Sequence, residues 1–590
     1  MSHHAPTDEI AFILKHVAGL DAAMQEGLTG DLNEELLDAI LTEAARFASE
    51  EIEPIARIGD RVGAKLDNGT VTMPPGWRDV YKAWCEGGWN AIGGPVDFGG
   101  QGLPQTLQSA VLEIWNSASI AFALGPTLTF GAIDALHKHA SPELQATWLA
   151  KLVSGEWMAT MNLTEPQAGS DLALLKSRAE RAGDGSYRIF GTKIFITYGE
   201  HDLTDNIVHL VLARLPDAPA GTRGISLFLV PKVLINPDGS PGRRNDVWCT
   251  GLEHKLGLHG SPTCVMTYGD AGGAVGYLVG EENRGLQCMF TMMNSARLAI
   301  GIEGVAVGEA SYRKALAYAR DRRQGKVVGS DEAGPAPIVE HPDVQRMLLT
   351  QKALASAARA IAYACAQAID MSHWREGAEG RAWSDRAGLL TPIAKAFSSD
   401  IGVEAASLGI QVHGGMGYIE ETGAAVYLRD ARIVPIYEGT NGIQAIDLVT
   451  RKIGLAGGAA VAALFAELSA DIAAISTSEE GDLAAAGIAL DAALGTARAV
   501  TTVMQERFGH DQPAALAVAT PYLRLMALVI GGALMARAAN ASVRMKDPNT
   551  AARVALLTFF ADHILNDVKA LEATVTGGAA RFAKTAQALN

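Results

Sequence analysis

VPIYEGTNGIQ, residues 434–444, places a single carboxylate, Glu438, on a tight turn directly before a helix. Pro435 prevents a helix upstream of the turn, and Thr440 can cap the helix that follows it. Burial between apolar neighbours would raise the pKa of Glu438 and make it a usable proton acceptor near neutral pH. A capping or surface glutamate is the alternative interpretation.

Composition limits the possible classes of function. The chain has 590 residues, of which 48% are hydrophobic and 19% charged, so several domains with large cores are expected. The net charge of −16 argues against a nucleic acid or an anionic membrane as the main partner. The apolar run 525–536, about 12 residues long, is shorter than a bilayer requires, so we expect a core helix and no membrane span.

The cysteines are scattered and none has metal-ligand spacing with histidine, so we expect no metal site and a reduced protein without disulfides. They are Cys85, Cys249, Cys264, Cys288 and Cys365. The start, MSHHAPTDEIAF, shows no secretory signal. A cytoplasmic location is therefore expected.

Hydrophobic periodicity predicts a mainly α protein with an inserted antiparallel β-domain. The period changes from 3.6 toward 2 between about 161 and 285, as in SYRIFGTKIFITYGE. The expected parts are an N-terminal helical extension (1–35), a helical domain (36–160), the β-domain (161–285), a helical bundle containing Glu438 (286–455) and a further helical domain (456–590).

Several signatures of other enzyme classes are absent. GMG at 415–417 is followed by Glu420 where a dinucleotide-binding motif needs its third glycine, and no GxGxxG occurs elsewhere. The sequence also lacks a P-loop, HExxH and GxSxG. These absences argue against a nicotinamide enzyme, an NTPase, a zinc protease and an α/β-hydrolase.

Five other strings combine polar, glycine-rich or aromatic residues. MNLTEPQAGSDL (161–172) is a polar loop, KIFITYG (193–199) is a strand, and QVHGGMGYIEE (411–421) has glycines that let a backbone approach a phosphate or sugar. YARDRRQG (318–325) and NSARLAIG (294–301) carry arginines. Each has a plain structural alternative: a turn, a core strand, an interhelix turn, an arginine at a helix C-terminus, or a local ion pair.

Taken together, these strings and 434–444 resemble the acyl-CoA dehydrogenase family, in the family's order, from about 90 to 455. The resemblance implies that family's fold, with a helical domain, a β-domain and a four-helix bundle, here with an extra C-terminal helical domain. It implies FAD as cofactor and Glu438 as catalytic base. The implied FAD contacts are Thr164, Gly169, Ser170, Phe195, Thr197, Arg322, Gln411, Gly414, Gly415 and Thr440; the implied substrate contacts are Ser170, Arg297 and Gly439.

Several places in these strings depart from the commonest family pattern, and Gly442, where many relatives have a polar side chain, is one of them. Phe195 stands where tryptophan is more familiar and still offers an aromatic wall. The stretch after Arg322 is one residue short before its glycine, which leaves the register of that arginine open. The common aspartate three residues before Arg297 is Asn294 here, which has no charge to pair with Arg297.

The implied reaction is α,β-dehydrogenation of an acyl-CoA thioester to the trans-2-enoyl-CoA, with electrons passing to electron-transfer flavoprotein. The 411–421 segment is expected to reach the FAD of a neighbouring subunit, which implies a homodimer or larger. The long layout, KLGLHGSPTC and FTMMNSARLAIG resemble the bacterial 3-methylmercaptopropionyl-CoA dehydrogenase group, which acts in dimethylsulfoniopropionate breakdown. The expected substrate is therefore 3-(methylthio)propanoyl-CoA.

Other activities remain open. Short or medium acyl chains of fatty acid β-oxidation are the alternative substrates, and an acyl-CoA oxidase is the alternative reaction. A DNA-associated flavoprotein is a further alternative, but it needs a basic C-terminal face and lacks the catalytic glutamate. The tail after about 455 has no basic stripe, and Glu438 is present.

Overall fold

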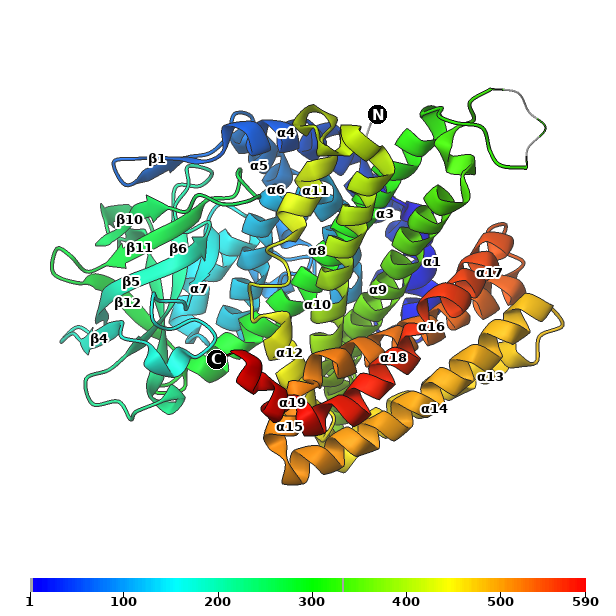
Figure 1. The fold of residues 1–590 in the computed structure, drawn as a ribbon. Helices are drawn as coiled ribbons and strands as arrows, with labels where there is room; N and C mark the ends of the chain where they lie inside the picture. The colour runs from blue at the N-terminus through cyan, green and yellow to red at the C-terminus, as the bar shows by residue number, and fades with distance from the viewer. Residues whose placement is uncertain (1–3, 330, 332–333, 590) are drawn as a thin grey trace. The chain divides into compact units, whose positions relative to one another are not determined.

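A computed structural model describes residues 4–329, 331 and 334–589. The chain divides into two compact units (Figure 1). Unit 1 consists mainly of Glu43–Pro104 and Ala118–Ala296, and unit 2 consists of Ala5–Thr42, Gln105–Ser117 and Arg297–Asn590.

An eight-stranded sheet forms the centre of unit 1, with seven strands in the order β10-β11-β5-β12-β7-β6-β3 and β4 paired with β5 and β6. Its strands are β3 (Met158–Asn162), β4 (Arg178–Arg181), β5 (Tyr187–Thr197), β6 (Ile207–Arg214), β7 (Ile225–Pro231), β10 (Val247–Leu252), β11 (Thr263–Tyr268) and β12 (Ala274–Val279). Most pairs are antiparallel, as expected, but β3 and β4 each pair with β6 in parallel. The expected antiparallel β-domain is confirmed, with parallel pairing of β3 with β6 and at one position of β4 with β6 as the exceptions.

Two smaller ribbons accompany this sheet: β8 (Val233–Ile235) with β9 (Pro241–Arg244), and β1 (Lys65–Asp67) with β2 (Thr70–Thr72). The β1–β2 hairpin lies in a region expected to be helical. Asn68 and Gly69 connect its strands with φ of 47° and 78°, the left-handed pair that Asn-Gly favours in a two-residue turn.

The core of unit 1 lies between one face of the sheet and helices. Buried residues of β3, β6 and β7 pack with Trp148 and Leu152 of α7 and with Met289 and Met292 of α8. The helices of this core are α6 (Gln105–His139), α7 (Pro142–Val153) and α8 (Gly285–Asp321), and unit 1 also contains α4 (Glu53–Val62) and α5 (Trp77–Glu86). β6 and β7 are buried along almost their whole length, which explains their nearly continuous apolar sequences.

Long helices build unit 2, and Figure 1 shows α9, α10 and α16 running alongside one another. Together with short helices they carry the 434–444 segment. Their bounds are α9 (Pro342–Trp374), α10 (Gly377–His413), α11 (Ala424–Ala431), α12 (Asn441–Asp447) and α16 (Ala519–Met545).

The N-terminal and C-terminal segments pack together within unit 2. Arg553 of α17 pairs with Glu9 at 2.7 Å and stacks on the ring of Phe12. Arg537 of α16 donates to the carbonyl of Val17. The segments contain α1 (Thr7–Ile13), α2 (Leu20–Gln25), α3 (Glu34–Phe47), α13 (Ala459–Ser476), α14 (Gly481–His510), α15 (Gln512–Ala517), α17 (Thr550–Phe559), α18 (Asp567–Ala573) and α19 (Ala579–Thr585).

Within the part of the chain that the structure describes, four helical stretches are long and apolar enough to cross a membrane, judged by length and composition alone: Gln105–His139, Leu455–Ser476, Gly481–His510 and Ala519–Met545. The length argument applied to 525–536 was wrong, because this run belongs to a 27-residue helix. Its burial supports the expected core helix, since 83% of the apolar window of α16 lies inside the protein.

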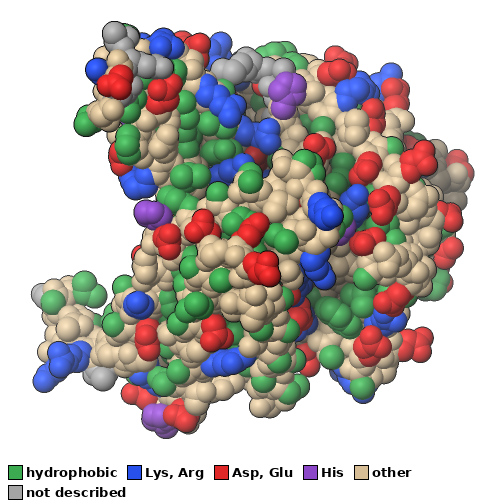
Figure 2. Space-filling model, turned by 90° about the vertical axis from the view of Figure 1, so that its right-hand side faces the viewer, with side chains coloured by type: hydrophobic (Ala, Val, Ile, Leu, Met, Phe, Trp, Pro, Cys, Tyr) green, Lys and Arg blue, Asp and Glu red, His purple; other side chains and the backbone are tan. Residues whose placement is uncertain are grey.

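The surface and the cysteines agree with the composition. On the face drawn in Figure 2, acidic and basic side chains of the described residues are interspersed with apolar ones. All five cysteines are free, as expected.

Candidate active site

The 434–444 segment forms a tight turn in unit 2. Glu438 and Gly439 both adopt left-handed backbone conformations, with φ of 54° and 83°. The amide of Asn441 closes the turn by donating to the carbonyl of Pro435 at 3.0 Å. Thr440 then caps α12, because its Oγ1 accepts from the amide of Ile443 at 3.2 Å. The expected turn and cap are confirmed.

Glu438 is partly buried beside two cations. Burial raises its pKa above the ordinary value, while the charges of Arg297 and Lys395 oppose that rise. The direction agrees with the sequence argument, and Lys395 is a second cation that the sequence argument did not include. A carboxylate whose proton affinity is set by burial against two positive charges is suited to accept a proton reversibly.

Arg297 is almost fully buried, and its Nη1 lies 3.9 Å from Oδ2 of Asp447 in α12. Asn294 cannot form an ion pair with Arg297, and Asp447, which lies 150 residues further along the chain, is the acidic partner instead. Burial lowers the pKa of Arg297, and the nearby carboxylates of Asp447 and Glu438 counteract this. Arg297 is therefore charged and close to the turn.

Two buried ionisable residues at this turn were missed by the sequence analysis. Lys395 of α10 donates to the carbonyl of Gly439 at 3.0 Å and to Oδ1 of Asn441 at 2.9 Å. Glu303 of α8 accepts a hydrogen bond from the hydroxyl of Tyr437. Their signal was a single charge within otherwise apolar helical strings, AIGIEGVAVG and PIAKAF.

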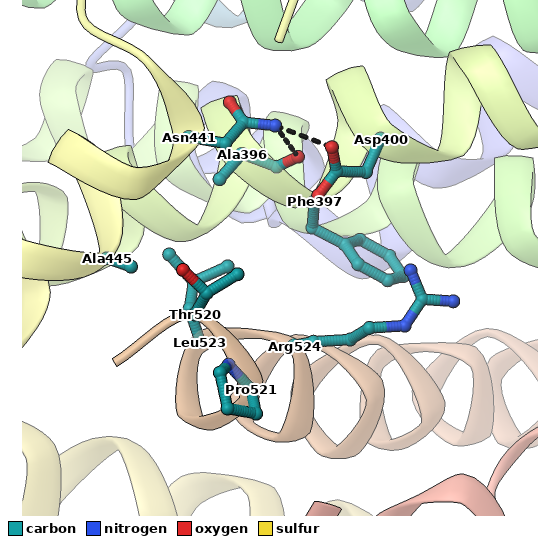
Figure 3. A pocket seen from close by; sticks show the side chains of 9 residues that line it. All are labelled: Ala396, Phe397, Asp400, Asn441, Ala445, Thr520, Pro521, Leu523 and Arg524. Atoms are coloured by element: carbon teal, nitrogen blue, oxygen red, sulfur yellow. Dashed lines mark hydrogen bonds between the residues drawn. The ribbon is translucent and has the colours of Figure 1, made fainter. Parts of the chain in front are cut away.

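Asn441 links the turn to α10 through its side chain. Its Nδ2 donates to the carbonyl of Ala396 at 3.1 Å and to Oδ1 of Asp400 at 2.7 Å (Figure 3). Gln444 supports the same turn by donating to the carbonyls of Glu438 and Gly439. A cavity of ≈ 220 Å³ adjoins Asn441, lined by Ala396, Phe397, Asp400, Asn441, Ala445, Thr520, Pro521, Leu523 and Arg524.

The polar loop after β3 lies in unit 1 and has a buried anchor. Glu165 accepts from Nζ of Lys193 at 2.8 Å and from the amides of Lys176 and Ser177. The residues expected to bind FAD flank this anchor: Thr164 is partly exposed, and Gly169 and Ser170 are exposed. The loop is thus anchored at Glu165 and exposes polar groups on either side of this anchor.

β5 of unit 1 presents an aromatic ring to its surroundings. Phe195 is 58% exposed and has a φ of 59°, a rare combination for an aromatic residue in a strand. The amide of Ile194 donates to the carbonyl of Thr164, and the carbonyl of Thr197 accepts from Oγ1 of Thr160. Thr164, Phe195 and Thr197 therefore lie together, and an exposed ring beside polar backbone suits a flat heterocycle such as a flavin.

The ends of α8 and α10 lie together in unit 2. Tyr318 stacks on His413 with their ring centroids 4.5 Å apart. Arg322 follows α8, is exposed, and donates to Gln324. Gln411, Gly414 and Gly415 are exposed at the end of α10. A Cβ atom at Gly414 or Gly415 would meet no atom within 4 Å, so this backbone is open to a ligand. Among the described residues, no cluster suited to a metal ion occurs.

Four sequence models of acyl-CoA dehydrogenase domains match the chain. They are described as the N-terminal domain (34–156), the middle domain (160–271), the C-terminal domain (283–453) and an acetyl-CoA dehydrogenase C-terminal-like domain (464–585). These matches together include every candidate site residue.

Known proteins resemble the chain over most of its length. 3-Methylmercaptopropionyl-CoA dehydrogenase of Ruegeria pomeroyi is 44% identical over 98% of both chains. A butyryl-CoA dehydrogenase of Syntrophomonas wolfei is 38% identical over 75% of this chain and 74% of its own. The crystal structure of an acyl-CoA dehydrogenase complexed with FAD from Bacillus anthracis has a TM-score of 0.75 at 20% identity, covering 92% of this chain and 88% of that one. The chain therefore belongs to the acyl-CoA dehydrogenase family of FAD-dependent oxidoreductases.

Proposed function

We propose that this acyl-CoA dehydrogenase oxidises 3-(methylthio)propanoyl-CoA to its trans-2-enoyl-CoA, with Glu438 as the base. The observation that carries the substrate is the 44% identity over 98% of the chain to the Ruegeria pomeroyi enzyme of that name. The observation that carries the base is the position of Glu438, partly buried beside Arg297 and Lys395.

In the proposed reaction Glu438 removes the proton from the carbon next to the thioester carbonyl. The α-C–H electron pair becomes the new C=C bond, and the proton ends on a carboxylate oxygen of Glu438. FAD, when bound, supplies the acceptor for the hydride that leaves the β-carbon. The backbone N–H of Glu438 is proposed to donate to the carbonyl oxygen, which stabilises the negative charge that develops there. Arg297, Ser170 and Gly439 are the proposed substrate contacts.

The remaining site residues are proposed to hold FAD. Phe195 and Thr197 would contact the flavin ring with Thr164, and the exposed amides near Gly169 and Ser170 can donate to its polar edge. Thr440, which caps α12, is also proposed to contact the flavin. Arg322 is proposed to pair with the pyrophosphate, since a guanidinium suits phosphate oxygens.

Gln411, Gly414 and Gly415 are proposed to contact the FAD of a second subunit, which makes the active form a homodimer or larger. Electron-transfer flavoprotein is the proposed acceptor in the following oxidative half-reaction. A cytoplasmic location is proposed as well, in agreement with five unpaired cysteines.

The 38% identity to a butyryl-CoA dehydrogenase supports a second candidate, a short-chain acyl-CoA substrate. The test is anaerobic bleaching of the flavin by a panel of acyl-CoA esters of rising length together with the methylthio ester. The proposal expects the highest kcat/KM with the methylthio ester. A butyryl ester that bleaches the flavin faster would transfer the assignment to the second candidate.

Glu438→Gln tests the base independently of the substrate. The variant should fold and retain FAD but bleach about a thousandfold more slowly, because an amide cannot accept the proton. Turnover at the wild-type rate would remove Glu438 from the mechanism. Peroxide formed without an added acceptor would instead identify an oxidase.

A further inference from the structure

Two buried side chains of opposite charge type hold the turn that carries Glu438 in unit 2. Glu303 of α8 is fully buried and accepts from the hydroxyl of Tyr437, the residue before Glu438. Lys395 of α10 is also fully buried and donates to the carbonyl of Gly439, the residue after Glu438. The proposed base is therefore held on both sides.

The backbone of Glu438 needs such support. Its φ of 54° places a residue with a Cβ atom in the left-handed region, which glycine prefers. Strained residues of this kind persist only where the surrounding structure fixes them, and they cluster at functional sites. Lys395 adds a second point of attachment through Oδ1 of Asn441 at 2.9 Å, so it spans the strained residue and the start of α12.

The same side chains set the charge around the carboxylate. Burial lowers the pKa of Lys395 to about 8, and the carboxylates that oppose this effect are Glu438, Asp400 and Glu303. Burial raises the pKa of Glu303 to about 8, although Tyr437 and Lys395 favour its charged form. Lys395 therefore lies within electrostatic reach of carboxyl groups from α8, α10 and the turn.

We propose that Lys395 and Glu303 are positioning residues for Glu438: Lys395 holds the Gly439 carbonyl and places a positive charge next to the turn, and Glu303 fixes Tyr437. This inference rests on the proposed role of Glu438. It adds two buried residues that lie outside the proposed substrate and cofactor contacts and act through the position and the charge environment of the carboxylate. The charged groups that act on Glu438 are Arg297 and Lys395, and Glu303 of α8 lies close enough for the charge of Glu438 to raise its pKa.

Lys395→Met tests the electrostatic part, because methionine keeps the length of the side chain and removes the charge. The acid limb of the kcat/KM profile should move up by about one pH unit, since loss of a nearby cation favours the protonated carboxyl. FAD content should stay at the wild-type level. Lys395→Arg should restore most of the acid limb by returning the charge. Lys352→Met, which removes an exposed lysine of α9, is the control and should keep the wild-type profile.

Tyr437→Phe tests the positioning part, because it removes only the hydroxyl that donates a hydrogen bond to Glu303. We expect kcat to fall about tenfold at every pH while KM changes less than twofold, since a displaced base affects the chemical step rather than binding. An acid limb that stays in place in Lys395→Met would overturn the electrostatic claim, and an unchanged kcat in Tyr437→Phe would overturn the positioning claim.

The outcomes separate this inference from the proposed function. If no acyl-CoA bleaches the wild-type flavin, or if Glu438→Gln remains active, the proposed function fails. If both behave as proposed and the two new variants match wild type, only the positioning role fails. Should Lys395→Met not fold, Tyr437→Phe decides, because a wild-type kcat in that variant contradicts the inference.

Discussion

Lys193 of β5 and Glu165 of the loop after β3 form a fully buried ion pair, with Nζ 2.8 Å from Oε1. Glu165 directly follows Thr164, and Lys193 lies two residues before Phe195, so the pair fixes two proposed flavin contacts at once. The same lysine also donates to the carbonyl of Leu163 at 3.0 Å.

Glu165→Gln should therefore loosen the loop and weaken cofactor retention. The change leaves Lys193 as a buried charge without its counter-ion, which costs roughly 3 kcal/mol or more of unfolding free energy. Chemical denaturation and the flavin-to-protein ratio after gel filtration measure both effects. Glu180→Gln on β4 is the matched control, because Glu180 is exposed in its pair with Arg178 and should change stability by less than about 1 kcal/mol. Equal effects of the two substitutions would contradict an anchoring role.

The same carboxylate predicts a loss of stability in acid. Burial alone would raise the pKa of Glu165, but Lys193 and the donors around it lower the pKa to about 2. Since the unfolded-state pKa is about 4.3, this carboxylate contributes roughly 3 kcal/mol above about pH 5, and the contribution is lost as pH falls toward 2. Denaturation midpoints from pH 6 to pH 3 should fall more steeply for wild type than for Glu165→Gln. Parallel slopes would show that the folded carboxylate titrates normally.

Phe195 predicts a direct effect on cofactor affinity. Its exposed ring contributes little to the core, so Phe195→Ala should leave the unfolding free energy of the apoprotein within about 0.5 kcal/mol. Loss of an aromatic contact with the flavin should weaken FAD binding by about tenfold. Titration of the apoprotein with FAD, followed by flavin fluorescence, measures the change. Phe195→Tyr retains the ring and should bind as wild type; a normal affinity in Phe195→Ala would place the ring away from the flavin.

Local sequence signals predicted the local features of the site. Thr440 caps α12 because a side-chain oxygen at that position meets the free amide of Ile443, an interaction that spans three residues. The Asn68-Gly69 turn carried an equally local signal for the β1–β2 hairpin, but the sequence analysis assigned the whole of 36–160 to a helical domain.

Partners far apart in sequence could not be predicted in the same way. Arg297 meets Asp447, and Glu303 meets Tyr437, only after α8 has packed beside the turn. The parallel pairing of β3 with β6 likewise depends on tertiary contacts, because a strand's own sequence does not specify its neighbour. Buried charges in the apolar helices α8 and α10 were the one available sign of such contacts, since an ionisable residue is rarely buried without a partner.

Substitutions at two glycines of the turn Gly414–Tyr418 should separate an effect on folding from an effect on cofactor binding. A Cβ atom at Gly417 would lie 2.3 Å from the carbonyl oxygen of Ile410, whereas one at Gly415 would meet nothing within 4 Å. Gly417→Ala should therefore lower the unfolding free energy by about 1–3 kcal/mol, because the backbone must shift to avoid the clash. Gly415→Ala should keep wild-type stability but lose FAD more readily, because a methyl group would occupy the space proposed for the cofactor of a second subunit. Thermal unfolding of the apoproteins and the flavin-to-protein ratio of the holoproteins distinguish the two. If Gly415→Ala retains FAD as wild type does, this turn does not approach the cofactor, and the proposed contact across subunits is wrong.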